Sequence, residues 1–338
     1  MKRLLEVERE LVAVFRSSET KLRANERARP LLEQASRDPA FLSEVLEKYL
    51  ATAGSLDKQN YPVVAMDIAV NPYFGLVVNC WIPLPSRETH ISTKAIHHHG
   101  DMLLSTATIF GPGYEHWMFS TPSPLDEGKA VYAMKLLEAE RHRLHHVAFV
   151  DAWIAHTPLY PESLSITLAL WSSKQPVTWR DRLKRVPLFK GREEQLRSVG
   201  VRLGLRKQLA LKVVENYDYY PTERGFNVMR ERKEFERGPN EDHVRSVFHV
   251  VQATGNEHLA RVVRRAIGEG KVTRGRPIAE RLLIDLERGR AIEGKLSVGH
   301  YDVPYANFTR DDIRRALAIT EPRIGCTDGG ILERQFAS

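Results

Sequence analysis

Residues from about Tyr61 to Pro176 form short runs rich in Val, Ile, Thr, Phe, Tyr and Trp, separated by turn sequences. This pattern constrains the fold more than any other feature of the chain. The turns read NP, PLP, GPG, TPSP and TPLYP. Gly and Pro end regular elements, whereas β-branched and aromatic residues favour strands. The segment therefore predicts a structure of many short β-strands.

The residues on either side of this segment carry apolar side chains at helical spacing. Residues 1 to about 52 show them three to four apart, and the spacing returns after Trp179 in NEDHVRSVFHVVQAT, PIAERLLIDLER and TRDDIRRALA. Residues 209–235 suit a strand or a helix equally well. We therefore predict an α+β chain with a helical region at 1–55, a β-barrel at 56–176 and a mostly helical region at 177–338.

Charge and cysteine content limit the functional classes. The net charge is +7, and residues 180–207 contain ten basic and three acidic residues, which equals the whole excess. A local basic strip favours a solvated helix face, with contact to an anion, a partner or RNA as the alternatives. The aromatic interleaving of RNA-binding segments is missing, so nucleic acid is not the expected partner. Two cysteines and no apolar run of membrane length favour a reducing, cytoplasmic setting without a membrane.

Histidines gather in the predicted barrel. Nine of the thirteen lie between His90 and His156. Side chains alternate faces along a strand, so in AIHHHGD the residues His97, His99 and Asp101 share one face while His98 points away. Two imidazoles on one inward face form half of a metal site, although polar residues at a barrel mouth can serve for hydrogen bonding alone. We expect a metal at His97 and His99.

A third ligand should come from another strand of the same barrel. The stretch HHVAFVDAWIAH predicts an apolar strand that ends at His156, followed by a turn and a second strand from Leu164 to Trp171. Counting back by twos from His156 gives small apolar residues that would line the space beside the metal. His145 and His146, at the far end of this predicted strand, are competing ligands. His116, in the GYEHW strand, is a candidate catalytic residue or substrate contact.

These residues resemble the two halves of the cupin metal motif. The parts that match are His97-x-His99, a gap of twelve to Gly111, the strand GYEHWMF and the strand-end His156. The resemblance implies a double-stranded β-barrel of jelly-roll type with a mononuclear metal at one mouth. A glutamate expected shortly after His99 is replaced by leucines, and the Pro-x-Gly and Asn expected near the final histidine are absent. The pattern is most similar to the three-histidine subset, which resembles the thiol dioxygenases.

A second resemblance uses overlapping residues. His99, Asp101 and His156 also form a His-x-Asp…His facial triad, similar to that of the JmjC-like oxygenases. Such a triad suits Fe(II) because it leaves adjacent positions for a cosubstrate and O₂. The lysine that binds 2-oxoglutarate in that family has no counterpart at residues 113–115. The two proposals differ in whether His97 or Asp101 binds the metal.

The expected chemistry follows from the ligands. Three neutral imidazoles leave the charge of the ion uncompensated, which favours a chelating anionic substrate and O₂ activation at Fe(II). Zn(II), Mn(II) or Ni(II) are the alternative ions, and zinc would suit a lyase or isomerase. Arg87 is a candidate clamp for a substrate carboxylate, or forms a surface ion pair. Tyr114 and Glu115 are candidate acid–base groups, and Trp153 is a candidate substrate contact from the pocket wall.

Other functions use the same features differently. A cupin could bind a ligand or metal without turnover, as a sensor or storage module. A helical interaction protein could instead use the basic strip on RNA or an acidic partner, with the barrel as a scaffold. The flanking helices are expected to close the barrel or to form a homodimer. Our leading prediction is an Fe(II) dioxygenase that acts on a small polar or anionic metabolite.

Overall fold

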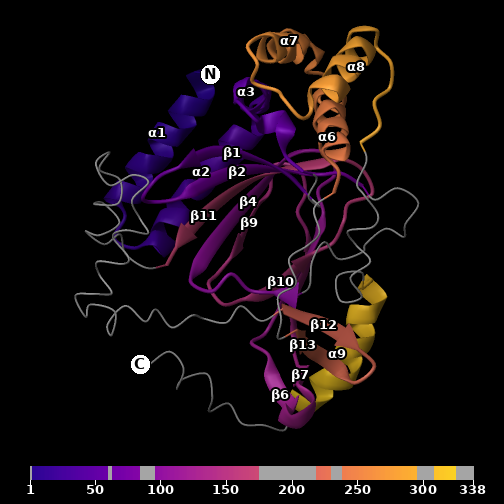
Figure 1. The fold of residues 1–338 in the computed structure, drawn as a ribbon. Helices are drawn as coiled ribbons and strands as arrows, with labels where there is room; N and C mark the ends of the chain where they lie inside the picture. The colour runs from indigo at the N-terminus through magenta and orange to yellow at the C-terminus, as the bar shows by residue number, and fades with distance from the viewer. Residues whose placement is uncertain are drawn as a thin grey trace, which may run out of the picture.

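The computed structural model describes residues 2–59, 63–83, 96–174, 218–229, 238–294 and 308–324. Arg87 and the basic segment 180–207 lie outside the described residues. Within the described ranges, helices occupy both ends of the chain and strands occupy its middle (Figure 1). The helices are α1 (Lys2–Ser17), α2 (Lys21–Arg37), α3 (Pro39–Ala51), α6 (Asn240–Ala253), α7 (Ala260–Gly268), α8 (Arg276–Glu287) and α9 (Arg310–Ile324), with 3-10 turns at Ser55–Asp57, Glu127–Lys129 and Glu257–Leu259.

The strands form two antiparallel sheets, which have the orders β1-β2-β11-β4-β9 and β6-β7-β13-β12-β3-β10-β5-β8. Their bounds are β1 (Val64–Val70), β2 (Gly75–Trp81), β3 (Ile96–His97), β4 (Met102–Phe110), β5 (Glu115–Phe119), β6 (Ser123–Asp126), β7 (Val131–Ala133), β8 (Leu136–Arg141), β9 (Val147–Val150), β10 (Ala155–Pro158), β11 (Ser165–Ser173), β12 (Asp218–Thr222) and β13 (Gly225–Met229).

The strand order identifies the barrel as a jelly roll. One layer is β2-β11-β4-β9 and the other is β3-β10-β5-β8, so the chain crosses between sheets at nearly every step from β2 to β11. This arrangement of two four-stranded antiparallel layers is the double-stranded β-barrel. With helices packed around it, the molecule has the predicted α+β class.

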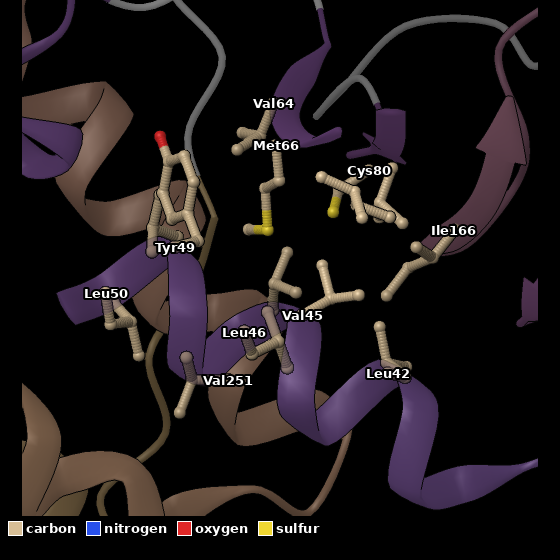
Figure 2. Close-up of a cluster of buried hydrophobic side chains, with 14 of the residues drawn as sticks. Leu42, Val45, Leu46, Tyr49, Leu50, Val64, Met66, Cys80, Ile166 and Val251 are labelled. Atoms are coloured by element: carbon tan, nitrogen blue, oxygen red, sulfur yellow. The ribbon is translucent and has the colours of Figure 1, made fainter. Parts of the chain in front are cut away.

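The amino-terminal helices cover the outer face of the five-stranded sheet (Figure 1). Apolar side chains of α3 recur three to four residues apart, and Leu42, Val45 and Leu46 are buried on one side of it. Figure 2 shows these side chains facing Met66 and Ile166 of the sheet. This apolar stripe packs against strands with alternating apolar residues, as part of the largest apolar cluster among the described residues.

Strands β12 and β13 extend the second sheet, although they come from the part of the sequence that suited strand or helix equally. β12 pairs with β3, and Asp218 lies opposite His97 in the register. Helix α9 packs on this hairpin, where Ile313 and Leu317 join the cluster that contains Phe226. The C-terminal region is therefore not only helical, because this hairpin completes the sheet beside β3.

The turn GPG before β5 requires its two glycines. Gly111 and Gly113 have φ of +80° and +79°, a left-handed conformation that strains other residues. A Cβ on Gly113 would lie 1.7 Å from the carbonyl oxygen of His142, and one on Gly111 would lie 2.0 Å from that of Leu164. The turn therefore lets two neighbouring backbone segments approach closely. None of the described helices is long and apolar enough to cross a membrane.

Candidate metal centre

Two of the predicted metal ligands face each other across a pair of strands. His97 of β3 lies directly opposite His156 of β10, and His156 lies opposite Met118 of β5. Directly opposed residues of antiparallel strands point to the same side of the sheet. The sheet therefore places His97, His156 and Met118 in one row on its inner face.

The third histidine completes a convergent group. The Nε2 atoms of His97 and His99 lie 3.0 Å apart, and one ring nitrogen from each of His97, His99 and His156 lies within 4.8 Å of the others. Two nitrogens that each bind one ion at about 2.1 Å, at a right angle, are about 3.0 Å apart. The spacing of the first pair therefore fits a shared metal ion, which a facial set of three imidazoles can hold.

The hydrogen bond of His156 to the backbone indicates which of its nitrogens carries the proton. Its Nδ1 lies 3.0 Å from the carbonyl oxygen of Ile154. A carbonyl oxygen only accepts hydrogen bonds, so Nδ1 carries the proton and Nε2 keeps its lone pair. Such a backbone bond is the usual way to fix the tautomer of a metal-binding histidine. His156 is 3% exposed and His97 is 7% exposed, so solvent competes little with these groups.

His98 points away from this group. Its Nδ1 accepts a hydrogen bond from the backbone N–H of Gly100 at 3.1 Å, and its ring packs on Trp153 with the centroids 5.2 Å apart. Burial lowers the pKa of His98 below its ordinary value. The alternation of faces expected for His97, His98 and His99 is therefore observed, although β3 itself ends at His97.

Asp101 lies outside the convergent group, and its carboxylate accepts a bond from an indole. Trp153 Nε1 donates to Asp101 Oδ1 at 3.0 Å, and the backbone N–H of Trp153 donates to the carbonyl oxygen of Gly100 at 2.9 Å. Trp153 has a φ of +67°, which a bulky residue rarely adopts. These bonds hold the turn before β10 against the loop that carries His99.

The same turn corrects the prediction that one continuous strand ends at His156. The stretch is instead two strands: β9 belongs to the five-stranded sheet and β10 belongs to the other. The left-handed Trp153 lies in the turn between them. His145 and His146 precede β9, where His145 Nδ1 lies 3.3 Å from Ser36 Oγ and His146 Nε2 lies 3.4 Å from Glu140. Neither belongs to the convergent group.

The predicted catalytic residues of the GYEHW segment divide between two faces. The carboxylate of Glu115 accepts a bond from Trp117 Nε1 at 2.8 Å and pairs with Arg310 of α9 at 3.1 Å. Trp117 belongs to the cluster on the face of β5 that α9 covers. Glu115 therefore lies on the opposite side of the strand from His116. Its acid–base role stays a prediction, as does the substrate contact of Arg87.

His116 and Tyr114 lie inside the barrel together with a residue that the sequence did not single out, His142. The ring centroid of His116 lies 5.1 Å from that of His156 and 4.8 Å from that of His142. The ring centroids of Tyr114 and His142 are 4.8 Å apart. Burial and the neighbouring imidazoles hold the pKa of His116 well below its ordinary value. Burial likewise lowers the pKa of His142 to about 3 and raises that of the Tyr114 hydroxyl. Both imidazoles are therefore neutral near pH 7.

His142 was missed because its segment, HRLHH, contains three histidines with no pattern that marks one of them as buried. Its position depends on long-range contacts. The backbone N–H of His142 donates to the carbonyl oxygen of Tyr114 at 2.9 Å, and its own carbonyl accepts from Thr108 Oγ1 at 2.8 Å. In the sequence, Gly113 is the residue that hints at this contact, because only a residue without a Cβ allows the His142 backbone to approach so closely.

An apolar wall lies on another side of the three histidines. The edge of the Trp171 ring meets His99 with the centroids 4.5 Å apart. Trp171, Met118 and Ile154 are half-buried and pack on the cluster of Leu104, Val150 and Ala169. The candidate centre therefore lies between an apolar surface and the neutral polar group of His116, His142 and Tyr114.

Comparisons with known proteins give distant structural similarity alone. No protein-family model and no curated protein matches the chain. It resembles a recombinant oxalate oxidase in complex with glycolate at 13% identity, over 48% of this chain and 77% of that chain, with a TM-score of 0.24. The cupin domain of Schizosaccharomyces pombe Cnp3 matches at 7% identity with a TM-score of 0.25. This match covers 38% of this chain and 74% of the Cnp3 domain chain.

A third structure is the capsular polysaccharide assembling protein CapF from Staphylococcus aureus, at 12% identity and a TM-score of 0.22. The match covers 34% of this chain and 29% of the CapF chain. Similarity at this level carries no conclusion about activity, so the assignment of the fold depends on the strand order. The jelly-roll order and the convergent histidines define a protein of the cupin fold with a candidate mononuclear metal centre.

Proposed function

We propose that the protein is a metal-dependent enzyme in which His97, His99 and His156 hold one divalent ion. The observation that carries this proposal is the convergence of three ring nitrogens within 4.8 Å. The backbone bond at Nδ1 of His156 supports it, since such a bond fixes the tautomer in which Nε2 can bind a metal. Fe(II) is the ion we propose, with Zn(II), Mn(II) and Ni(II) as alternatives. When bound, Fe(II) would supply open positions for a chelating substrate and O₂.

The protein groups determine which substrate such an ion can accept. Three neutral imidazoles add no negative charge to the site, so a small anionic or bidentate metabolite would complete it best. Trp171 and Met118 present apolar surface next to the ligand histidines, which lowers the access of water. We therefore propose a non-haem oxygenase of dioxygenase type.

The alternative facial triad of His99, Asp101 and His156 has less support. Asp101 lies outside the group of convergent ligand atoms, and one of its oxygens already accepts the Trp153 indole N–H. His97 instead contributes a nitrogen 3.0 Å from that of His99. These observations favour direct activation of a chelated substrate over a mechanism that depends on 2-oxoglutarate.

Metal analysis of ligand variants tests the proposal. The protein is purified, loaded anaerobically with Fe(II), desalted and analysed for metal, alongside His97→Ala, His156→Ala and the control His258→Ala. His258 is exposed and lies in the 3-10 turn Glu257–Leu259, which precedes α7. We expect about one iron per chain in the wild type and the control, and less than half in the two ligand variants. Full metal content in His156→Ala would contradict the assignment.

Oxygen consumption tests the reaction class. The iron-loaded protein is mixed with panels of small hydroxy acids, thiols and diketones, and O₂ uptake is followed with an electrode. Uptake that requires both iron and a chelating compound supports the oxygenase. Turnover of a compound by the zinc-loaded protein without O₂ would favour the lyase or isomerase instead.

A further inference from the structure

His116 is a buried polar side chain on the inner face of the barrel, next to the three histidines. It is 4% exposed and projects from β5 to the inner face, two residues before Met118. Its ring lies against the rings of His142 and His156. Buried polar side chains usually hydrogen-bond, and one on the inner face beside a binding site can do so with the molecule that binds there.

His116 is not one of the proposed metal ligands. The ring nitrogens that come together belong to His97, His99 and His156, and His116 is not among them. His116 instead lies next to that group, with its ring 5.1 Å from the ring of His156. His116 therefore contacts a proposed ligand and is not itself a ligand.

The residues behind His116 hold it in place. His142 Nδ1 lies 3.4 Å from Thr106 Oγ1, and the His142 backbone is anchored to Tyr114 and Thr108. The ring of Tyr114 packs on His142, and it meets the His116 ring edge-on with the centroids 6.2 Å apart. Because these contacts come from several strands, the imidazole of His116 is presented in one orientation toward the histidine group.

We propose that His116 forms a hydrogen bond to the molecule that binds at the three-histidine centre. This inference rests on the proposed metal site. The ring nitrogens of an imidazole can donate or accept a hydrogen bond, so His116 suits a hydroxyl, carbonyl or amide group.

The apolar residues next to the three histidines limit the class of ligand further. Trp171 packs its ring on His99, and Met118 lies directly opposite His156. A molecule held at the centre would therefore meet apolar side chains as well as His116. We therefore infer a small molecule with a chelating end, a hydrogen-bonding group and an apolar portion.

A spectroscopic titration tests this role without a known substrate. The protein is loaded with Co(II), whose visible bands report its ligands, and is titrated with azide and with acetohydroxamate. The variants are His116→Phe, which keeps a ring but removes both nitrogens, and His116→Gln, which restores a donor and an acceptor. His258→Phe is the control.

We expect all four proteins to bind one Co(II). Both probes should bind about tenfold more weakly to His116→Phe, the size of effect that loss of one hydrogen bond produces. Binding to His116→Gln should recover to within about threefold of the wild type, since its amide replaces the lost bond. Circular dichroism checks that each variant is folded.

The remaining outcomes distinguish the failure of this inference from that of the metal site. Equal probe affinity in all four proteins would refute the role of His116 and leave the metal site standing. Loss of Co(II) from both folded His116 variants would make His116 a metal ligand instead, and would also refute the inference. A wild type that binds no Co(II), or whose bands neither probe changes, would overturn the metal site or its open position together with the inference.

Discussion

Replacement of Asp101 by Asn separates the two possible ligand sets. Asn keeps an oxygen in the position of Oδ1, so the bond from Trp153 Nε1 at 3.0 Å can survive with a neutral acceptor. A hydrogen bond to a charged acceptor contributes about 1.5–3 kcal/mol to stability, and a neutral one about 0.5–1.5 kcal/mol. We therefore expect the free energy of unfolding of the metal-free protein to fall by about 1 kcal/mol.

The effect on metal affinity should be moderate if Asp101 acts only by holding the turn of Trp153. Loss of such supporting contacts weakens metal binding by about 10 to 100-fold, or about 1.4 to 2.8 kcal/mol. Isothermal titration with Co(II) and metal analysis after Fe(II) loading measure this directly. Asp67→Asn is the matched control, because Asp67 is an exposed carboxylate on edge strand β1. We expect the control to bind metal as the wild type does.

The opposite pattern would refute the reasoning. If Asp101 is a ligand of a facial triad, Asp101→Asn should be nearly free of iron while His97→Ala retains it. Turnover would then consume 2-oxoglutarate and release succinate. An iron-free Asp101→Asn beside an iron-replete His97→Ala would overturn the three-histidine centre, whereas the reverse would exclude the triad.

Three further predictions follow from the same geometry. His98→Gln should keep a full complement of metal, since His98 points away from the centre, and loss of metal from the folded variant would contradict this. Gly113→Ala should lower the free energy of unfolding in urea by more than about 3 kcal/mol, because its Cβ would overlap the His142 carbonyl. Gly54→Ala is the control: at a φ of +75° with open space around it, it should lose only about 1 kcal/mol, and equal losses would refute the steric argument. The folded-state pKa of His142, about 3, is lower than in the unfolded chain, so the unfolded state binds more protons between about pH 3 and 6.5. The chelator-treated protein should therefore lose stability as the pH falls through this window, and His142→Gln should flatten the slope; an unchanged slope in urea titrations at pH 7 and 5 would show that His142 does not cause it.

Much of the candidate site could be read from local pattern. The alternation of side chains along a strand placed His97 and His99 on one face and His98 on the other, because this period is a property of the backbone alone. The helical spacing of the first fifty residues predicted α1 to α3 for a similar reason, since a helix buries one stripe of its surface. The change to strand-forming residues near Tyr61 is followed by the first strand, β1, at Val64.

Other features depended on contacts between distant segments. The sequence from His145 to His156 looks like one apolar strand, but Trp153 turns the chain from one sheet into the other. The partner that stabilises this turn is Asp101, which lies far away in the sequence and close in space. Local propensity contains no information about such a partner.

What the sequence by itself determined is the identity of the three converging histidines and the β-rich, turn-punctuated character of the segment that carries them. Only the tertiary structure decided that Glu115 faces α9, that His116 faces the centre, and that His142 lies buried behind it. Strand parity assigns residues to two faces without saying which face is the interior. That choice is made when the two sheets close over each other and the helices cover one outer surface, because burial is a property of the whole assembly of layers.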